Sequence, residues 1–196
     1  MHAQKRLASI LVKIRTISIN QHYYRSVDNA SFYEHYPFQP LYALGPGITG
    51  ARFTPKDGPP SLYVSEQPLT TLCEASGIAA SLLRAGVLIK RPLVTYAIKV
   101  KLKCVLDLTN QSVIEALGTT FRELNGPWKE QIKNMAAVPT HILARAAYKT
   151  NRFEGIKFWS HEQLGIANLL IWTDSVRSPS YIEVVDDSKT LWARLP

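Results

Sequence analysis

Apolar residues recur at regular spacing along most of the chain, and the spacing predicts a succession of short helices and strands. Between Gln4 and Arg15 they recur three or four positions apart, which predicts an amphipathic helix. From Leu93 to Leu108 apolar and polar residues alternate, which predicts a long strand with one buried face. Further strands are predicted over His22–Ser26, Ser61–Ser65, Phe153–Trp159, Asn168–Trp172 and Tyr181–Val185. Further helices are predicted over Pro68–Ala85 with an interruption near Gly77, Ser112–Leu117 and Pro139–Lys149.

The predicted strands outnumber the helices and follow one another closely. This order favours an α+β fold, with a mixed or antiparallel β-sheet core and flanking helices, over a doubly wound parallel sheet. The region from Pro37 to Pro60 is dense in proline and glycine and is predicted to be a long loop with no element of its own. Loops of that length in compact domains are usually functional or mobile. We assign residues 1–20 to an N-terminal amphipathic helix, packed on the core or separate from it, and residues 21–196 to one domain.

Length and composition are those of an ordinary globular domain. The chain has 196 residues, of which 46% are hydrophobic and 19% charged, and no apolar run reaches the roughly 20 residues that a membrane span requires. Lys13 and Arg15 interrupt the apolar pattern that a secretory signal needs, whereas the lack of acidic residues before Asp28 keeps a transit peptide open beside a plain surface helix. Two cysteines are too few for a disulfide framework, so a reducing, cytoplasmic location without membrane association is expected.

The chain carries a formal net charge of +8. Nucleic acid, an acidic protein partner or a phosphate-bearing substrate each fits such a charge. The densest basic cluster, Lys99, Lys101 and Lys103, alternates and therefore lies on one face of the predicted strand. We favour the solvated face of an amphipathic strand as its explanation, and a basic nucleic-acid-binding module stays as an alternative.

The sequence context argues against a dinucleotide-binding loop and against a histidine metal site. The stretch Gly45-Pro-Gly47-Ile-Thr-Gly50 matches G-x-G-x-x-G, a pattern that binds dinucleotides only between a strand and a helix. Pro55 and two further prolines follow it, so we expect no helix there and reject a dinucleotide-binding βαβ unit. The five histidines show no metal-ligand spacing, so no metal is expected.

Four polar residues stand out by their context. Arg52 lies in the Gly/Pro-rich loop, and Tyr63 lies in the apolar strand after it. Glu74 lies in an otherwise apolar helical segment, and Ser160 ends the segment that begins at Phe153. Taken singly, each has an ordinary explanation: a loop cap, a core aromatic, a solvated helix residue and a turn residue.

Taken together, these residues resemble the RES domain, a toxin family named for its Arg, Glu and Ser, over most of the chain. Family members show a Tyr-Arg pair, a Gly-Gly-Arg-Trp-Asn-Pro-like loop, a Val-Tyr-Leu-Ala-like strand, a helix with Glu, a Pro-Thr-Gln helix, Gly-Ile-Arg-Tyr-Pro-Ser and an Asn-Leu-Val-Leu-Phe strand. The similar stretches here are Tyr24-Arg25, Gly50-Ala-Arg52-Phe-Thr-Pro55, Leu62-Tyr63-Val64-Ser65, the helix with Glu74, Pro139-Thr-His141, Gly155-Ile-Lys-Phe-Trp-Ser160 and Asn168-Leu-Leu-Ile-Trp172. The chain departs from the pattern at Phe53, Thr54, Lys157 and Trp159.

The resemblance implies an ADP-ribosyltransferase-like fold and NAD⁺ as the substrate, cleaved between nicotinamide and ribose, with no other cofactor. Arginine suits the pyrophosphate, so Arg25 and Arg52 are its candidate ligands, and the resemblance adds Tyr24. Glu74 would stabilise the oxocarbenium-like ribose. Tyr63 would stack on or orient the nicotinamide, and Ser160 would hydrogen-bond the ribose or the carboxamide.

The acceptor of the ADP-ribose stays open at this stage. Water would make the enzyme a glycohydrolase, phosphate a phosphorylase, and a protein side chain an ADP-ribosyltransferase. The resemblance also implies an Xre-type helix-turn-helix antitoxin as partner, and a homodimer is a further expectation. Direct binding of nucleic acid is not expected.

Overall fold

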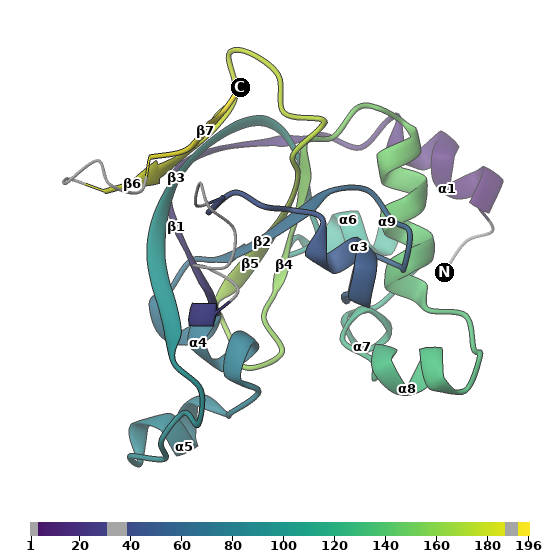
Figure 1. Ribbon diagram of the computed structural model, residues 1–196. Coiled ribbons are helices and arrows are strands. Elements are labelled where there is room, and N and C mark those ends of the chain that lie inside the picture. The colour runs from purple at the N-terminus through teal and green to yellow at the C-terminus, as the bar shows by residue number, and fades with distance from the viewer. Residues whose placement is uncertain (1–3, 31–38, 187–191) are drawn as a thin grey trace.

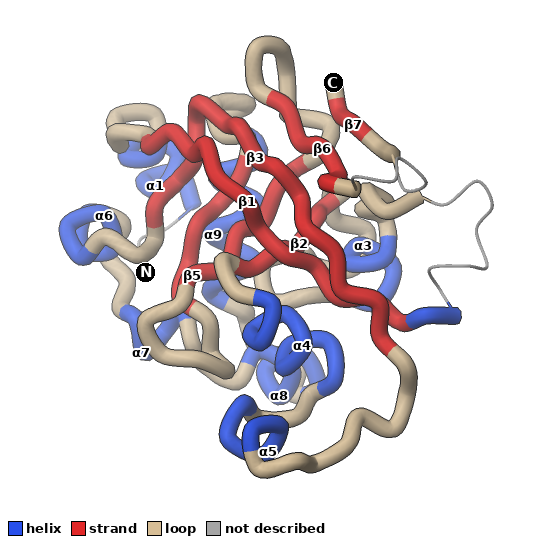
Figure 2. Tube along the Cα trace, turned by 90° about the vertical axis from the view of Figure 1, so that its left-hand side faces the viewer, coloured by secondary structure: helices blue, strands red, loops and turns tan. Residues whose placement is uncertain are grey.

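The computed structural model describes residues 4–30, 39–186 and 192–196, and they form a bent mixed sheet flanked by helices (Figure 1). The strand order is β1-β2-β5-β4-β3-β6-β7. Strand β1 also pairs with β3, so five strands close into a circuit, and Figure 2 shows β1 and β3 side by side. All pairs are antiparallel except β3 with β4. The expected mixed sheet with flanking helices is therefore present.

The strands mostly lie where the apolar patterns predict them. Their bounds are β1 Ile17–Asp28, β2 Ser61–Ser65, β3 Leu93–Asp107, β4 Gly155–Trp159, β5 Ala167–Trp172, β6 Tyr181–Val185 and β7 Arg194–Leu195. Strand β1 extends beyond the predicted five residues because it pairs with β3 over nearly its whole length. Its added residues, such as Asn20 and Gln21, are exposed and polar, so no local pattern marks them. Strand β7 was not predicted.

Eight helices or helical turns are described. They are α1 Gln4–Leu11, α3 Gly45–Thr49, α4 Pro68–Ser76, α5 Ala80–Arg84, α6 Gln111–Ala116, α7 Phe121–Leu124, α8 Trp128–Lys133 and α9 Pro139–Lys149. The break predicted near Gly77 is confirmed, since Gly77 ends α4 in the left-handed conformation at φ 70°. Helices α7 and α8 were not predicted.

The prediction that residues 37–60 contain no element is wrong. Within the described part of that segment, α3 forms over the G-x-G-x-x-G stretch itself, with a proline in its first turn; residues 37 and 38 lie outside the described residues. The glycines serve close backbone packing. A Cβ on Gly47 would lie 2.9 Å from the Gly58 carbonyl oxygen, and Gly50 takes φ 84° where α3 ends.

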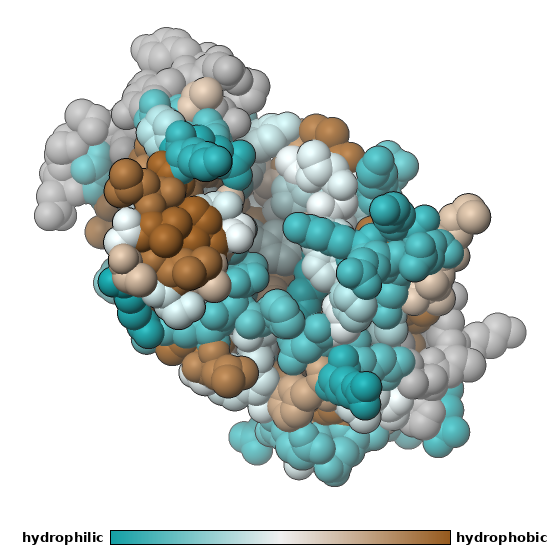
Figure 3. Space-filling view, turned by 90° about the horizontal axis from the view of Figure 1, so that it is seen from below, coloured by the Kyte–Doolittle hydropathy of each residue, from teal (hydrophilic) through white to brown (hydrophobic). Residues whose placement is uncertain are grey.

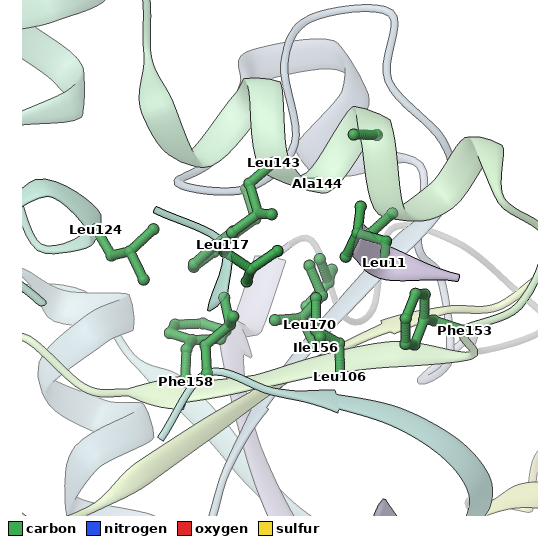
Figure 4. Packing of buried hydrophobic residues seen from close by; sticks show 14 of the residues in the cluster. Leu11, Leu106, Leu117, Leu124, Leu143, Ala144, Phe153, Ile156, Phe158 and Leu170 are labelled. Carbon is green, nitrogen blue, oxygen red and sulfur yellow. The ribbon is translucent and has the colours of Figure 1, made fainter. Parts of the chain in front are cut away.

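Two hydrophobic clusters lie on opposite faces of the sheet. The first packs beneath α9 and α1, and Figure 4 shows Leu11 and Leu143 above Leu106, Ile156 and Leu170 of the sheet. The second holds the inward residues of β3, among them Ile98 and Val100. Strand β5 is buried on both faces, as the apolar run 169–172 within it predicts. Helix α1 packs on α9 with Leu11 fully buried, so the N-terminal helix belongs to the core.

Among the described residues, no helix is both long and apolar enough to cross a membrane.

Candidate active site

A cavity of about 620 Å³ opens on the sheet face that carries the first cluster, beyond the edge of that cluster. Its volume lies within the usual range for small-molecule sites. One wall is α4, and the opposite wall is residues 125–130 with the start of α8. Figure 3 looks at the molecule from below and shows it hollowed between the lobe of α4 and α5 and the lobe of α7 and α8.

The floor of the cavity is a row of side chains from three neighbouring strands. Ser65 of β2 lies opposite Asn168 of β5, and Asn168 lies opposite Phe158 of β4. Directly opposed residues point to the same face of a sheet, so all three face the cavity, which they line. Tyr63 lies two residues before Ser65 and shares that face. The floor is therefore part aromatic and part polar.

Glu74 projects from α4 over this floor and is held by two neighbours. Its Oε1 accepts hydrogen bonds from Ser160 Oγ at 3.0 Å and from Asn168 Nδ2 at 2.9 Å. Both donors are buried, and the Ser160 backbone N–H donates to the Ile166 carbonyl at 2.9 Å. The carboxylate is therefore oriented by the ends of β4 and β5.

Arg52 lies across the cavity from the α4 wall and binds the C-terminal end of α7. Its guanidinium donates twice to the Leu124 carbonyl oxygen, at 2.8 and 3.1 Å, once to Asn125 Oδ1, and once to the Trp159 carbonyl oxygen at 3.2 Å. These bonds use four of its five N–H donors. Burial lowers the pKa of Arg52 to about 10, while the nearby Glu74 carboxylate acts in the opposite direction, so the group stays charged at neutral pH.

The loop that carries Arg52 is fixed from two sides. From β2, the Tyr63 hydroxyl accepts the Phe53 N–H at 3.1 Å and shares a hydrogen bond with Thr54 Oγ1 at 2.8 Å. From α9, Thr140 Oγ1 donates to the Arg52 carbonyl oxygen, and His141 Nε2 donates to the Ala51 carbonyl oxygen at 2.8 Å. Burial raises the pKa of Tyr63 and lowers that of His141.

The structure brings four of the predicted site residues together and separates two. Arg52, Tyr63 and Glu74 line the cavity, and Ser160 lies behind Glu74 as its hydrogen-bond donor. Tyr24 lies opposite Ser65 in register, one strand beyond the cavity lining. Arg25 also lies outside the lining, and its Nη1 donates to the Pro40 and Tyr42 carbonyl oxygens at 3.1 and 2.9 Å.

Sequence reasoning missed Asn168 and the whole wall around α8. Asn168 is a polar residue in an otherwise apolar strand, which was a signal for a functional position. Trp128 follows a Gly-Pro pair in a polar segment, a weaker signal. Among the described residues, no three His, Cys, Asp or Glu side chains lie grouped as metal ligands.

This arrangement suits a substrate with an anionic part and a centre that becomes positive during reaction. A fixed carboxylate stabilises developing positive charge, and a nearby guanidinium attracts an anion. The aromatic floor of Tyr63 and Phe158, whose ring centroids are 6.4 Å apart, offers a surface for a flat ring.

Comparison with known proteins gives one family and one fold. The model of the RES-domain family matches residues 22–193. A solved structure titled as the M. tuberculosis MbcT-MbcA toxin-antitoxin complex contains a similar chain, with a TM-score of 0.70 and 16% sequence identity over 94% of this chain and 92% of that one. None of the curated proteins is significantly similar in sequence.

Proposed function

The chain belongs to the RES-domain family, and on that premise we propose that it is a toxin that destroys NAD⁺ by cleaving the bond between nicotinamide and ribose. The observation that carries this proposal is Glu74, held by Ser160 and Asn168 over an aromatic floor and facing the charge of Arg52. An ADP-ribosyltransferase-like fold and a cytoplasmic location stay predictions.

The proposed chemistry is the breaking of one carbon–nitrogen bond. The electron pair of the bond between ribose C1′ and the pyridinium nitrogen moves onto that nitrogen, so nicotinamide leaves as a neutral base and needs no acid. The ribose becomes oxocarbenium-like, and the Glu74 carboxylate stabilises that positive charge. The acceptor then bonds to C1′ and loses its proton to solvent. Arg52 attracts the negatively charged pyrophosphate.

The acceptor decides which enzyme this is. Water makes it an NAD⁺ glycohydrolase and phosphate makes it a phosphorylase, whereas a protein side chain makes it an ADP-ribosyltransferase. The products, ADP-ribose, its 1-phosphate or a labelled protein, separate the three.

An antitoxin protein is the proposed partner, by analogy with the toxin–antitoxin complex that contains the similar chain. That the antitoxin is of the Xre type, and that the toxin forms a homodimer, stay predictions. The nucleic-acid alternative rests on Lys99, Lys101 and Lys103. Lys99 lies opposite Glu183 on β6, and the Lys99 and Lys101 ammonium groups lie over the Tyr181 ring at 5.9 and 5.8 Å. Because these two lysines already lie beside an acidic residue and an aromatic ring of the protein, we do not favour nucleic-acid binding.

The test is NAD⁺ consumption by the purified chain, with and without phosphate, for the wild type and Glu74→Gln. We expect nicotinamide release by the wild type and a loss of at least about 100-fold in the variant, since a fixed charge supplies several kcal/mol to such a transition state. Glu115→Gln is the matched control, because Glu115 is an exposed helical glutamate outside the cavity lining. Near-normal turnover by Glu74→Gln would remove Glu74 from the mechanism.

A further inference from the structure

Arg52 has too few unused N–H donors to bind a pyrophosphate by itself. Four of its five N–H groups already bind Leu124, Asn125 and Trp159. A pyrophosphate has many acceptor oxygens and two negative charges, so a single remaining donor satisfies little of it. Arg25, the other arginine expected there, binds backbone carbonyl oxygens outside the cavity lining.

One further cation reaches the cavity. Among the described residues that line it, the lysine and arginine side chains are Arg52 and Lys129. Lys129 is exposed and lies on α8, so its three ammonium donors are accessible to a ligand. Its Nζ lies 5.5 Å from the centre of the Trp128 ring.

Helix α8 contributes nothing to the hydrophobic core, since it has no buried residue. Trp128 is nevertheless half-buried at its start, where the indole contacts His141 with 6.4 Å between ring centroids and lines the cavity. An indole that lines a cavity beside an ammonium group is the pairing that binds a flat base next to a phosphate. The Lys129 ammonium now lies over the indole, and its movement to a phosphate would uncover that ring for a base.

Glu74 and Trp128 line opposite walls of the cavity, so a dinucleotide bound across it places one half at each wall. Glu74 stands on the α4 wall, Arg52 follows and binds Asn125, and Trp128 comes three residues after Asn125 on the opposite wall. In NAD⁺ the ribose of the scissile bond is followed by the pyrophosphate and then by adenosine. With Glu74 at the scissile ribose, the adenine half extends toward α8.

We propose that Trp128 and Lys129 form the subsite for the adenosine diphosphate half of the substrate, with the indole stacked on the adenine and the ammonium group paired with the pyrophosphate. The identity of the ligand rests on the proposed function. The two residues thus select a dinucleotide over smaller nicotinamide nucleosides.

The test is calorimetric binding of ADP-ribose to the full chain, because ADP-ribose carries the adenine and both phosphates but has no nicotinamide bond. We expect Trp128→Ala and Lys129→Ala each to weaken binding about 10-fold, whereas Trp128→Phe keeps most of the affinity. Trp192→Ala and Lys133→Ala are the matched controls, exposed residues outside the cavity lining, and should change binding less than about twofold. Thermal unfolding checks that each variant is folded.

Turnover measured in parallel separates the two proposals. For NAD⁺, kcat/KM should fall by the same factor in the Trp128 and Lys129 variants, whereas for nicotinamide riboside, which lacks the whole adenosine diphosphate half, it should not change. Wild-type chain that fails to bind ADP-ribose, or binding unchanged in both variants, overturns the subsite. ADP-ribose binding that depends on Trp128 and Lys129 without any NAD⁺ loss refutes the enzymatic function and supports the subsite.

Discussion

Replacement of Tyr63 by phenylalanine tests whether its hydroxyl holds the Arg52 loop or acts on the substrate. The ring stays, so no cavity forms, and the change removes only the hydroxyl bonds to the Phe53 N–H and to Thr54. Each such bond contributes about 0.5–1.5 kcal/mol, and the buried Phe53 N–H loses its acceptor. We therefore expect Tyr63→Phe to lower the free energy of unfolding by about 2 kcal/mol.

The assay is urea unfolding at neutral pH, in which the midpoint should fall with an unchanged slope. Tyr148→Phe is the matched control, because the Tyr148 hydroxyl donates to Asp174 at an exposed position and its loss should cost under about 1 kcal/mol. The kcat/KM for NAD⁺ should also fall, since the loop that positions Arg52 loses an anchor. An unchanged midpoint together with lost turnover would refute this reasoning and place the hydroxyl on the substrate.

Asn168→Ala removes one of the two hydrogen bonds to Glu74 and should lower kcat for NAD⁺ about 10-fold; an unchanged kcat would mean that Ser160 alone orients the carboxylate. Leu11→Ala should lower the free energy of unfolding by about 2–5 kcal/mol in urea, and a cost under about 1 kcal/mol would show that α1 is dispensable to the core. Burial lowers the pKa of His141, so the unfolded chain binds its proton more readily and stability should fall as pH drops below about 6.5. The pH dependence of unfolding should be weaker in His141→Gln, and equal slopes would contradict this assignment.

Much of the secondary structure follows from the sequence alone. Strands β2 and β6 and helix α9 have the predicted bounds, because their apolar residues repeat at strand or helix spacing within one short segment. Helix α7 was not predicted because its four residues, although they include the buried Leu124, are too few to repeat an apolar spacing. Helix α8 buries no residue, so its sequence carries no apolar period.

The sequence likewise identified several of the site residues, but it did not show which residues they hydrogen-bond. Arg52, Glu74 and Ser160 stand out by context and by resemblance to the RES domain. That the Arg52 donors bind Leu124, 72 positions away, and that Asn168 orients Glu74 from 94 positions away, depends on how the strands pair.

The sequence by itself therefore determined most of the elements, the fold class and the family, since local periodicity and motif residues are properties of short segments. Only the tertiary structure showed that β1 pairs with β3, that Arg25 lies outside the cavity lining, and that Trp128 and Lys129 form one wall of the cavity. The physical reason is that hydrogen bonds and packing join residues far apart in the chain. The local spacing of apolar residues does not specify which distant segment will supply the hydrogen-bond or packing partner.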